Sequence, residues 1–395
     1  ANGRAQEGMR VLKQALTLAP GVFRLQAALG RVALRGGLRT TARAALQRSL
    51  AIRPQALDVK RLLAYLDRKG PDPLVKRWAR DAKALARAAW KGRHAKEDAE
   101  VLLDTTAYDV LQSGLARRFQ QRVVLIHNRK GVAAWRYQQI DYLPDTQQLE
   151  VRVARIIRPD GSEVEARHHD VQMTQPSIRM YYDRRVKVVR FTGLRPGDVV
   201  ELQTVLSDIP ATNAFKDYFG TILPLQTTVP IRRIQVAIAM PAARKLRFNK
   251  PPVPGLRHRA TRQGKARLYH WEARNVAAVE QEPQMPGWAE THAHLHVSTF
   301  QTWRDVARWY WGLVKEQFHA DDALRKAALA AARGQTTVRG KVEAIYHLVV
   351  KKTRYVALAF GMHTYKPYSA PQVFARKFGD CKDKALLLYL LARAL

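Results

Sequence analysis

The sequence contains a single cysteine, Cys381, in 395 residues. An internal disulfide is therefore excluded, and so is a structural zinc site built from several cysteines. No window approaches the roughly 18 apolar residues that a membrane-spanning helix needs. The phosphate-binding loop, the glycine-rich dinucleotide fingerprint and the His-Glu-x-x-His motif are also missing. We therefore expect no cofactor and no membrane span in this chain.

Acidic residues are scarce, with 33 Asp and Glu against 68 Lys and Arg, which gives a net charge of +35. Such an excess is typical of proteins that bind nucleic acid. The basic residues are dispersed, however, and form no run of five or six like charges. We expect weak attraction to polyanions and no specific nucleic-acid partner. A basic polyanion-binding protein is kept as an alternative function.

The first part of the chain repeats itself. Residues 12–20 align with residues 46–54 at an offset of 34, which is the tetratricopeptide period. Residues 1–70 are thus predicted to form a tetratricopeptide-like α-solenoid whose concave surface binds a protein partner, a plain helical bundle being the alternative. A stable solenoid usually needs roughly three helix pairs, and about two are visible here. We therefore expect further repeats before Ala1. Residues 71–100 are predicted to be a helical linker.

The period of the apolar residues changes near Val101. Short β-type runs are then separated by turn signals, which predicts an antiparallel, sandwich-like region over residues 101–285. The order of four motifs, at residues 142–144, 158–161, 194–201 and 275–286, resembles the β-rich domain of unknown function 3857 that commonly precedes transglutaminase-like domains in bacteria. This resemblance implies no chemistry of its own.

Three histidines, His292, His294 and His296, alternate along the chain. In a strand they would share one face, where imidazoles could bind zinc or copper. The alternative is an extended connector whose histidines are solvated or hydrogen-bonded. Because no fourth ligand lies nearby, we favour the connector.

A helical face of apolar residues follows in the last third of the chain. It is predicted to pack in the core and consists of Trp303, Val306, Trp309, Tyr310 and Leu313.

Cys381 lies at a predicted helix start. Gly379 and Asp380 interrupt the preceding structure, Asp380 can serve as the N-cap, and leucines spaced to bury a helix follow to Leu395. Unpaired backbone N–H groups and the helix dipole favour a thiolate in such a first turn. The alternative is a buried thiol acting as a small hydrophobic group. Its charged flanks, Asp380 and Lys382 to Lys384, argue for a nucleophile.

The motif Gly-Asp-Cys-Lys-Asp-Lys-Ala at residues 379–385 follows Arg354-Tyr355-Val356 and Tyr365-Lys366-Pro367. Together these resemble the transglutaminase-like domain of bacterial proteins, which has a papain-type cysteine core. The resemblance covers the chain from about residue 303 and implies that Cys381 is the nucleophile acting on a protein or peptide. It also implies a periplasmic or cell-envelope location, with the cytoplasm as the alternative.

In that family a histidine and an aspartate follow the cysteine helix. None of His319, His347 and His363 occupies that place in chain order. We therefore expect both partners beyond Leu395, and a chain that is inactive alone.

The sequence thus predicts a multidomain α+β protein, with residues 286–395 forming part of a transglutaminase-like domain. The predicted function is cysteine acyl transfer or hydrolysis, as in a peptidase or amidase, through a thioester at Cys381. The alternative is a non-catalytic tetratricopeptide scaffold with a silent papain-like domain.

Overall fold

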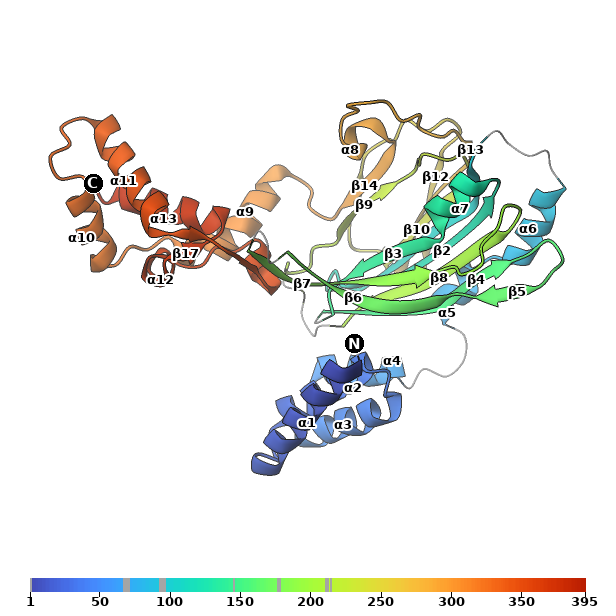
Figure 1. Ribbon diagram of the computed structural model, residues 1–395, viewed down its shortest axis with the longest axis horizontal. Coiled ribbons are helices and arrows are strands. Elements are labelled where there is room, and N and C mark those ends of the chain that lie inside the picture. The colour runs from blue at the N-terminus through green and yellow to red at the C-terminus, as the bar shows by residue number, and fades with distance from the viewer. Residues whose placement is uncertain are drawn as a thin grey trace. The chain divides into compact units, whose positions relative to one another are not determined.

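The computed structural model describes residues 2–66, 72–91, 97–144, 146–175, 179–209, 213 and 215–395. The chain is a mixed α+β protein with a large β-sheet region and several groups of helices (Figure 1). It divides into two compact units. Unit 1 comprises Ala1–Val171 and Val186–Thr299, and unit 2 comprises Gln172–Arg185 and Phe300–Leu395. In the part of the chain that is described, no helix is long and apolar enough to cross a membrane.

The first four helices pack on one another through small residues. Gly30 lies so close to Leu46 that an added Cβ would stand 2.6 Å from the leucine Cγ. The shared core includes Ala33, Ala42 and Leu46, all fully buried. The interpretation of this segment as a tetratricopeptide solenoid stays a prediction. The helices are α1 (Asn2–Leu18), α2 (Phe23–Arg35), α3 (Arg39–Ile52) and α4 (Leu57–Leu66).

An eight-stranded sheet forms the centre of unit 1, in the order β12-β13-β10-β1-β2-β8-β4-β5. Strand β1 pairs antiparallel with β2 but parallel with β10. The predicted antiparallel region is therefore a mixed sheet, because alternating side chains reveal which face is buried but not strand direction. The strands are β1 (Ala99–Val110), β2 (Ala116–Ile126), β4 (Gln147–Ile157), β5 (Glu163–Glu165), β8 (Val199–Asp208), β10 (Ile231–Pro241), β12 (Arg257–Gln263) and β13 (Ala266–Val276).

Several smaller elements lie outside this sheet. Strands β9 (Gly220–Pro224), β11 (Arg247–Phe248) and β14 (His294–Ser298) form a three-stranded sheet. The main apolar core of unit 1 includes side chains of the large sheet together with Leu223, Leu295 and Val297 of the small one. A two-sheet sandwich is not confirmed. The other elements are α7 (Arg129–Trp135), β3 (Tyr137–Tyr142), β6 (Arg167–Gln175), β7 (Met180–Arg190) and α8 (Trp288–Thr291).

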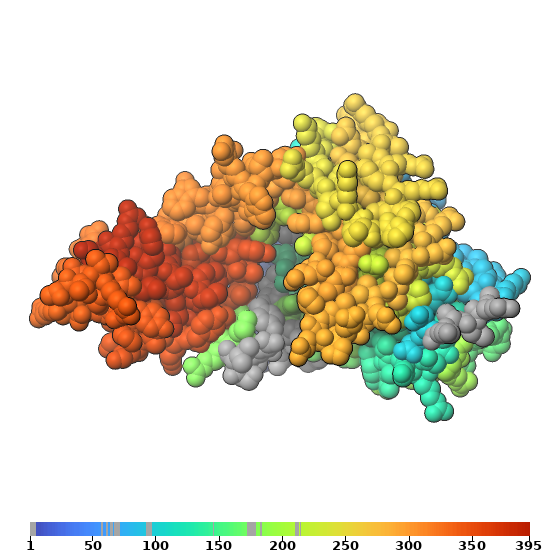
Figure 2. Space-filling view, turned by 90° about the horizontal axis from the view of Figure 1, so that it is seen from above, coloured from blue at the N-terminus to red at the C-terminus, as the bar shows by residue number. Residues whose placement is uncertain are grey.

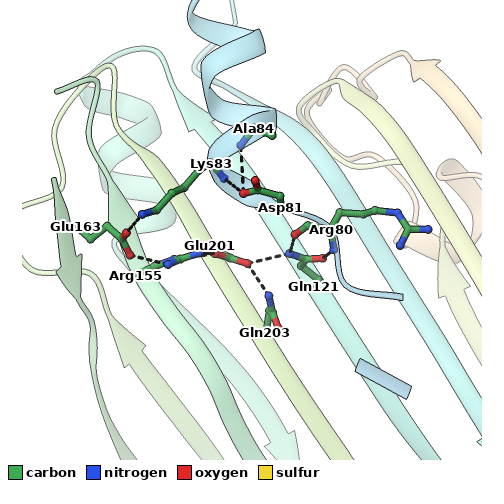
Figure 3. Close-up of polar contacts among 9 residues, drawn as sticks. All are labelled: Arg80, Asp81, Lys83, Ala84, Gln121, Arg155, Glu163, Glu201 and Gln203. Carbon is green, nitrogen blue, oxygen red and sulfur yellow. Dashed lines mark hydrogen bonds and ion pairs between the residues drawn. The ribbon is translucent and has the colours of Figure 1, made fainter. Parts of the chain in front are cut away.

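Two short helices, α5 (Pro73–Trp78) and α6 (Ala82–Trp90), cover part of the large sheet. The Gln121 side chain accepts a hydrogen bond from the Arg80 backbone N–H at 2.8 Å and donates one to the Arg80 carbonyl at 2.8 Å. Gln121 also donates to Glu201, a buried carboxylate of β8. The segment predicted to be a linker is therefore fixed to the sheet by polar contacts as well as apolar ones (Figure 3).

Glu201 is the centre of that polar network. Gln203 donates to its Oε1 at 2.6 Å, and Arg155 Nε donates to its Oε2 at 2.8 Å. Arg155 also pairs with Glu163, which in turn binds Lys83 of α6 (Figure 3). Burial opposes the charge of Arg155, but the hydrogen bonds and negative charges of Glu201 and Glu163 outweigh it and raise the pKa of the guanidinium.

Unit 2 is mainly helical, and its last helices share an apolar core; its residues toward the C-terminus are the red ones in Figure 2. Its core is built from Leu324, Ile345, Val373 and Leu387. The predicted core face of α9 (Trp303–Val314) is not buried: Trp303 is 87% exposed and Tyr310 41%, and Val306, Trp309 and Leu313 are only half-buried. The assignment of this face to the core was therefore wrong. The elements are α9 (Trp303–Val314), η2 (Lys315–Gln317), α10 (Asp322–Ala331), α11 (Val338–Lys352), β15 (Arg354–Tyr355), β16 (Ala357–Ala359), η3 (Gly361–Thr364), α12 (Ala370–Arg376), β17 (Phe378–Gly379) and α13 (Cys381–Arg393).

Candidate active site at the start of helix α13

Cys381 is the first residue of α13, and its side chain is exposed to solvent. Asp380 caps the helix by accepting a hydrogen bond from the backbone N–H of Asp383, whose own carboxylate accepts one from the backbone N–H of Asp380. This reciprocal capping box fixes the first turn. The thiol is thus held at the positive end of the helix dipole, where a negative charge is favoured.

Asp383 connects this turn to the preceding loop. Its side chain is only 2% exposed, and it accepts hydrogen bonds from the Tyr368 backbone N–H at 2.8 Å and from Arg376 Nη2 at 3.0 Å. The Arg376 guanidinium lies over the rings of Tyr368 and Phe378, 4.1 and 4.6 Å from their centroids. Buried charges need such full pairing. These contacts fix the backbone on both sides of Cys381.

A two-strand parallel pairing brings Tyr355 to the same place. Tyr355 of β15 is in register with Gly379 of β17, and the Val356 N–H donates to the Gly379 carbonyl at 3.2 Å. A Cβ at position 379 would stand 2.6 Å from the Asp383 Cβ, so the close approach requires glycine. The strand pairing therefore depends on the glycine that precedes the capping box.

The β15–β17 pairing places Tyr355, which is 45% exposed, close to Cys381. Partial burial raises the pKa of the Tyr355 phenol, and the negative charge of Cys381, a hydrogen bond with its side chain and the charge of Asp380 raise it further, although the Cys381 backbone N–H opposes this. The phenol therefore stays protonated around neutral pH and can donate a hydrogen bond to a thiolate. No role for Tyr355 was predicted from the sequence, although the motif Arg354-Tyr355-Val356 that supports the family resemblance contains it.

The histidines of unit 2 have other partners. His363 stacks on Tyr368, with ring centroids 3.7 Å apart, and its Nδ1 lies 3.0 Å from the Lys366 carbonyl oxygen. His319 Nδ1 lies 3.0 Å from the carbonyl oxygen of Glu316. Across the described residues, no histidine forms a hydrogen bond with Cys381. The site therefore combines the thiol, the helix N-terminus and a phenol, but brings no imidazole to the sulfur.

The candidate metal ligands His292, His294 and His296 do not form a site. Strand β14 begins only at His294, and His292 precedes it as the C-cap of α8. The Nδ1 atoms of His292 and His294 make local hydrogen bonds, to the Thr291 hydroxyl and to the His292 carbonyl. Within the ranges that the structure describes, no three His, Cys, Asp or Glu side chains are arranged to hold a metal ion.

The β-rich part of the chain matches a known family. Residues 112–280 match the family model described as a domain of unknown function with a solved structure, DUF3857. This stretch is a DUF3857 domain. The match confirms the resemblance found for the β-rich region. The DUF3857 domain includes every strand of the large sheet except β1, which ends at Val110.

One solved structure resembles most of the chain. It is a candidate protease from Parabacteroides distasonis, with a TM-score of 0.62 and 18% identity over 76% of this chain and 59% of that protein. This similarity shows the fold alone, and the chain spans less than two thirds of that protein's length.

A second solved structure, the M1 zinc metallopeptidase of Deinococcus radiodurans, has a TM-score of 0.29 and 15% identity over 51% of this chain and 42% of that one. That similarity supports no inference. No curated protein sequence matches the chain significantly.

Proposed function

We propose that this protein is a peptidase-like cysteine enzyme in which Cys381 forms a thioester with a peptide or glutamine side-chain carbonyl. The observation that carries the proposal is the position of Cys381, solvent-exposed in the first turn of α13 and beside the Tyr355 phenol. Reactive cysteines occur at such partly exposed helix N-termini, whereas buried structural thiols are inert. The fold shared with a candidate protease and the resemblance to transglutaminase-like domains support the same chemistry.

In the proposed reaction the Cys381 thiolate attacks the carbonyl carbon and forms a carbon–sulfur bond. The carbonyl electrons move to the oxygen, and their return expels the amine, which takes up the proton that the Cys381 thiol gave up and leaves a thioester. Water or a second amine then attacks the thioester and releases the thiolate. The proton acceptor would be a histidine that follows the cysteine helix, in the order that the family resemblance implies.

Tyr355 would act both before and during the attack of the thiolate on the carbonyl carbon. Before the attack, its hydroxyl donates a hydrogen bond to the thiolate. As negative charge moves from sulfur to the carbonyl oxygen, the same donor and the backbone N–H groups of the α13 first turn lie near the developing oxyanion. Donors held in place before the reaction stabilise such a charge without reorganisation.

Acylation by an activated ester tests the nucleophile, because a good leaving group needs no general acid. The chain is mixed with 4-nitrophenyl acetate, nitrophenolate release is recorded, and intact-mass spectrometry with peptide mapping locates the acetyl group. The matched control is Cys381→Ser combined with Val338→Cys, which moves the only thiol to the first position of α11, where Val338 is 80% exposed. We expect Cys381 to react about tenfold faster than the control thiol, a barrier difference of about 1.4 kcal/mol. Equal rates would contradict the proposal.

A further inference from the structure

A pocket that the proposed enzyme chemistry does not use lies open to solvent among α2, the residues at the end of α3 and the start of α4. Its volume is about 430 Å³, and its lining comes from α2, from the segment before α4 and from the start of α4. Ligand sites in proteins typically measure about 300 to 1,000 Å³. The Phe23 carbonyl accepts a hydrogen bond from the fully buried Ser49 hydroxyl at 2.9 Å, which fixes the backbone that carries the aromatic wall of the pocket.

Two arginines meet at the Phe23 ring. The guanidinium carbon of Arg53 lies 4.8 Å from the ring centroid and that of Arg24 lies 5.8 Å from it. Arg24 and Arg53 form no ion pair with any described residue. The pocket's carboxylate, Asp58, is paired with Arg31. Three arginines less one aspartate leave the lining with a formal charge of +2, concentrated on the two guanidinium groups at one ring.

We propose that this pocket binds an acidic peptide segment, with one Glu or Asp carboxylate of the partner lying between Arg24 and Arg53. Guanidinium groups bind carboxylates in planar, paired hydrogen bonds, and their contact with Phe23 limits the freedom they would lose on binding. An apolar side chain next to that carboxylate would lie against Phe23, Ala27 and Ala56. The inference does not depend on whether the four helices are tetratricopeptide repeats.

The apolar part of the lining favours a peptide over a nucleic acid. The surface of Phe23, Ala27 and Ala56 offers contact to a peptide side chain next to the carboxylate, whereas nucleic-acid binding depends mainly on phosphate contacts.

Fluorescence anisotropy tests the proposal on the full chain. The probe is a fluorescein-labelled peptide, Leu-Glu-Glu-Leu-Asp-Glu, beside the same peptide with Gln and Asn in place of the acids. The pocket variant is Arg24→Gln with Arg53→Gln. The control variant, Arg48→Gln with Lys60→Gln, removes the same charge from exposed positions of α3 and α4 that do not line the pocket. Circular dichroism establishes that both variants keep their helices.

We expect the acidic peptide to bind, the pocket variant to raise its Kd about tenfold, and the control variant to change the Kd less than about twofold. Equal weakening by both variants would assign the affinity to dispersed charge and overturn the proposal. The proposal also fails if the Gln and Asn peptide binds equally well, if an oligodeoxythymidylate of the same length displaces the probe at lower concentration, or if no binding occurs.

Discussion

Arg376 donates a hydrogen bond to the buried carboxylate of Asp383 at 3.0 Å, and this pair joins the end of helix α12 to helix α13, which carries the candidate nucleophile. Replacing Asp383 by alanine would leave the Arg376 charge without its partner and would remove half of the capping box. Breaking a buried pair in this way costs about 3 to 5 kcal/mol. We expect Asp383→Ala to increase hydrogen exchange across the first turns of α13, measured by mass spectrometry.

The control for Asp383 is Asp322→Ala, which removes an aspartate from the exposed pair with Arg325 at the start of α10. Exposed ion pairs of this kind contribute little to stability. Hydrogen exchange across the first turns of α13 in Asp322→Ala should therefore stay close to that of the unchanged protein. Similar exchange in both variants would show that Asp383 does not hold the turn.

Replacing Tyr355 by phenylalanine would remove the hydroxyl beside Cys381 and leave the ring in place. A hydrogen bond to a charged group contributes about 1.5 to 3 kcal/mol, so acylation of Cys381 by 4-nitrophenyl acetate should slow by at least about tenfold. Tyr346→Phe is the control, because Tyr346 is 53% exposed and lies on α11 beside His347, with ring centroids 5.6 Å apart. An unchanged rate in Tyr355→Phe would remove Tyr355 from the mechanism.

The titration of Tyr355 should depend on Cys381. The thiolate charge contributes to the raised pKa of the phenol, since a phenolate beside it would be a second negative charge. In Cys381→Ala that contribution is lost while the contribution of burial remains, so the phenol should ionise at lower pH. The difference between the ultraviolet titration curves of the unchanged protein and Cys381→Ala reports this tyrosine. The assignment is confirmed if that difference disappears when Tyr355→Phe is compared with the double variant Tyr355→Phe/Cys381→Ala.

His270 should make unit 1 sensitive to acid. Its ring stacks on Trp78 of α5 at 5.5 Å, and its Nε2 is buried without a hydrogen-bond partner. Burial lowers its pKa below 6.5, and the positive charges of Arg259, Arg233 and Arg80 add to this effect, although Glu272 opposes it. The unfolded chain then binds more protons than the folded one, so stability falls as the pH drops below about 6.5.

His270→Gln should therefore lose less stability between about pH 7 and about pH 5 than the unchanged protein, as followed by urea unfolding with Trp fluorescence. His319→Gln, at an exposed position, should leave the pH dependence unaltered. If His270→Gln and the unchanged protein lose stability in parallel, His270 titrates normally in the folded state.

Glu201 should be needed to hold α6 on the sheet. Its carboxylate is 1% exposed and accepts hydrogen bonds from Gln121, Gln203 and Arg155. Glu201→Ala would leave these donors partly unsatisfied, at a cost of about 3 to 5 kcal/mol. Glu150→Ala, which breaks the less buried pair with Arg152, is the control. Urea denaturation of both variants should show a lower midpoint for Glu201→Ala alone.

Local features of the fold could be predicted from the sequence. The turn at Gly161 lies between β4 and β5, and the turn at Gly197 directly precedes β8, each glycine having a positive φ. The start of α13 at Cys381 follows from its capping residue. In each case the signal and the structure lie within a few residues of one another, so backbone preference alone is sufficient.

Features that join distant parts of the chain could not be predicted. Trp303 has the spacing of a buried helix face, but spacing does not show whether another element covers that face. Tyr355 reaches Cys381 only because β15 pairs with β17. The catalytic role of Cys381 and the domain boundaries stay predictions.

Strand β1 ends at Val110, before the first residue of the DUF3857 match at 112, yet it lies between β2 and β10 in the sheet. The large sheet therefore extends beyond the sequence family match. A chain begun at residue 112 would expose two unpaired strand edges in the middle of a sheet, and such edges pair readily with other molecules. Soluble expression of this domain should thus require a start before Ala99.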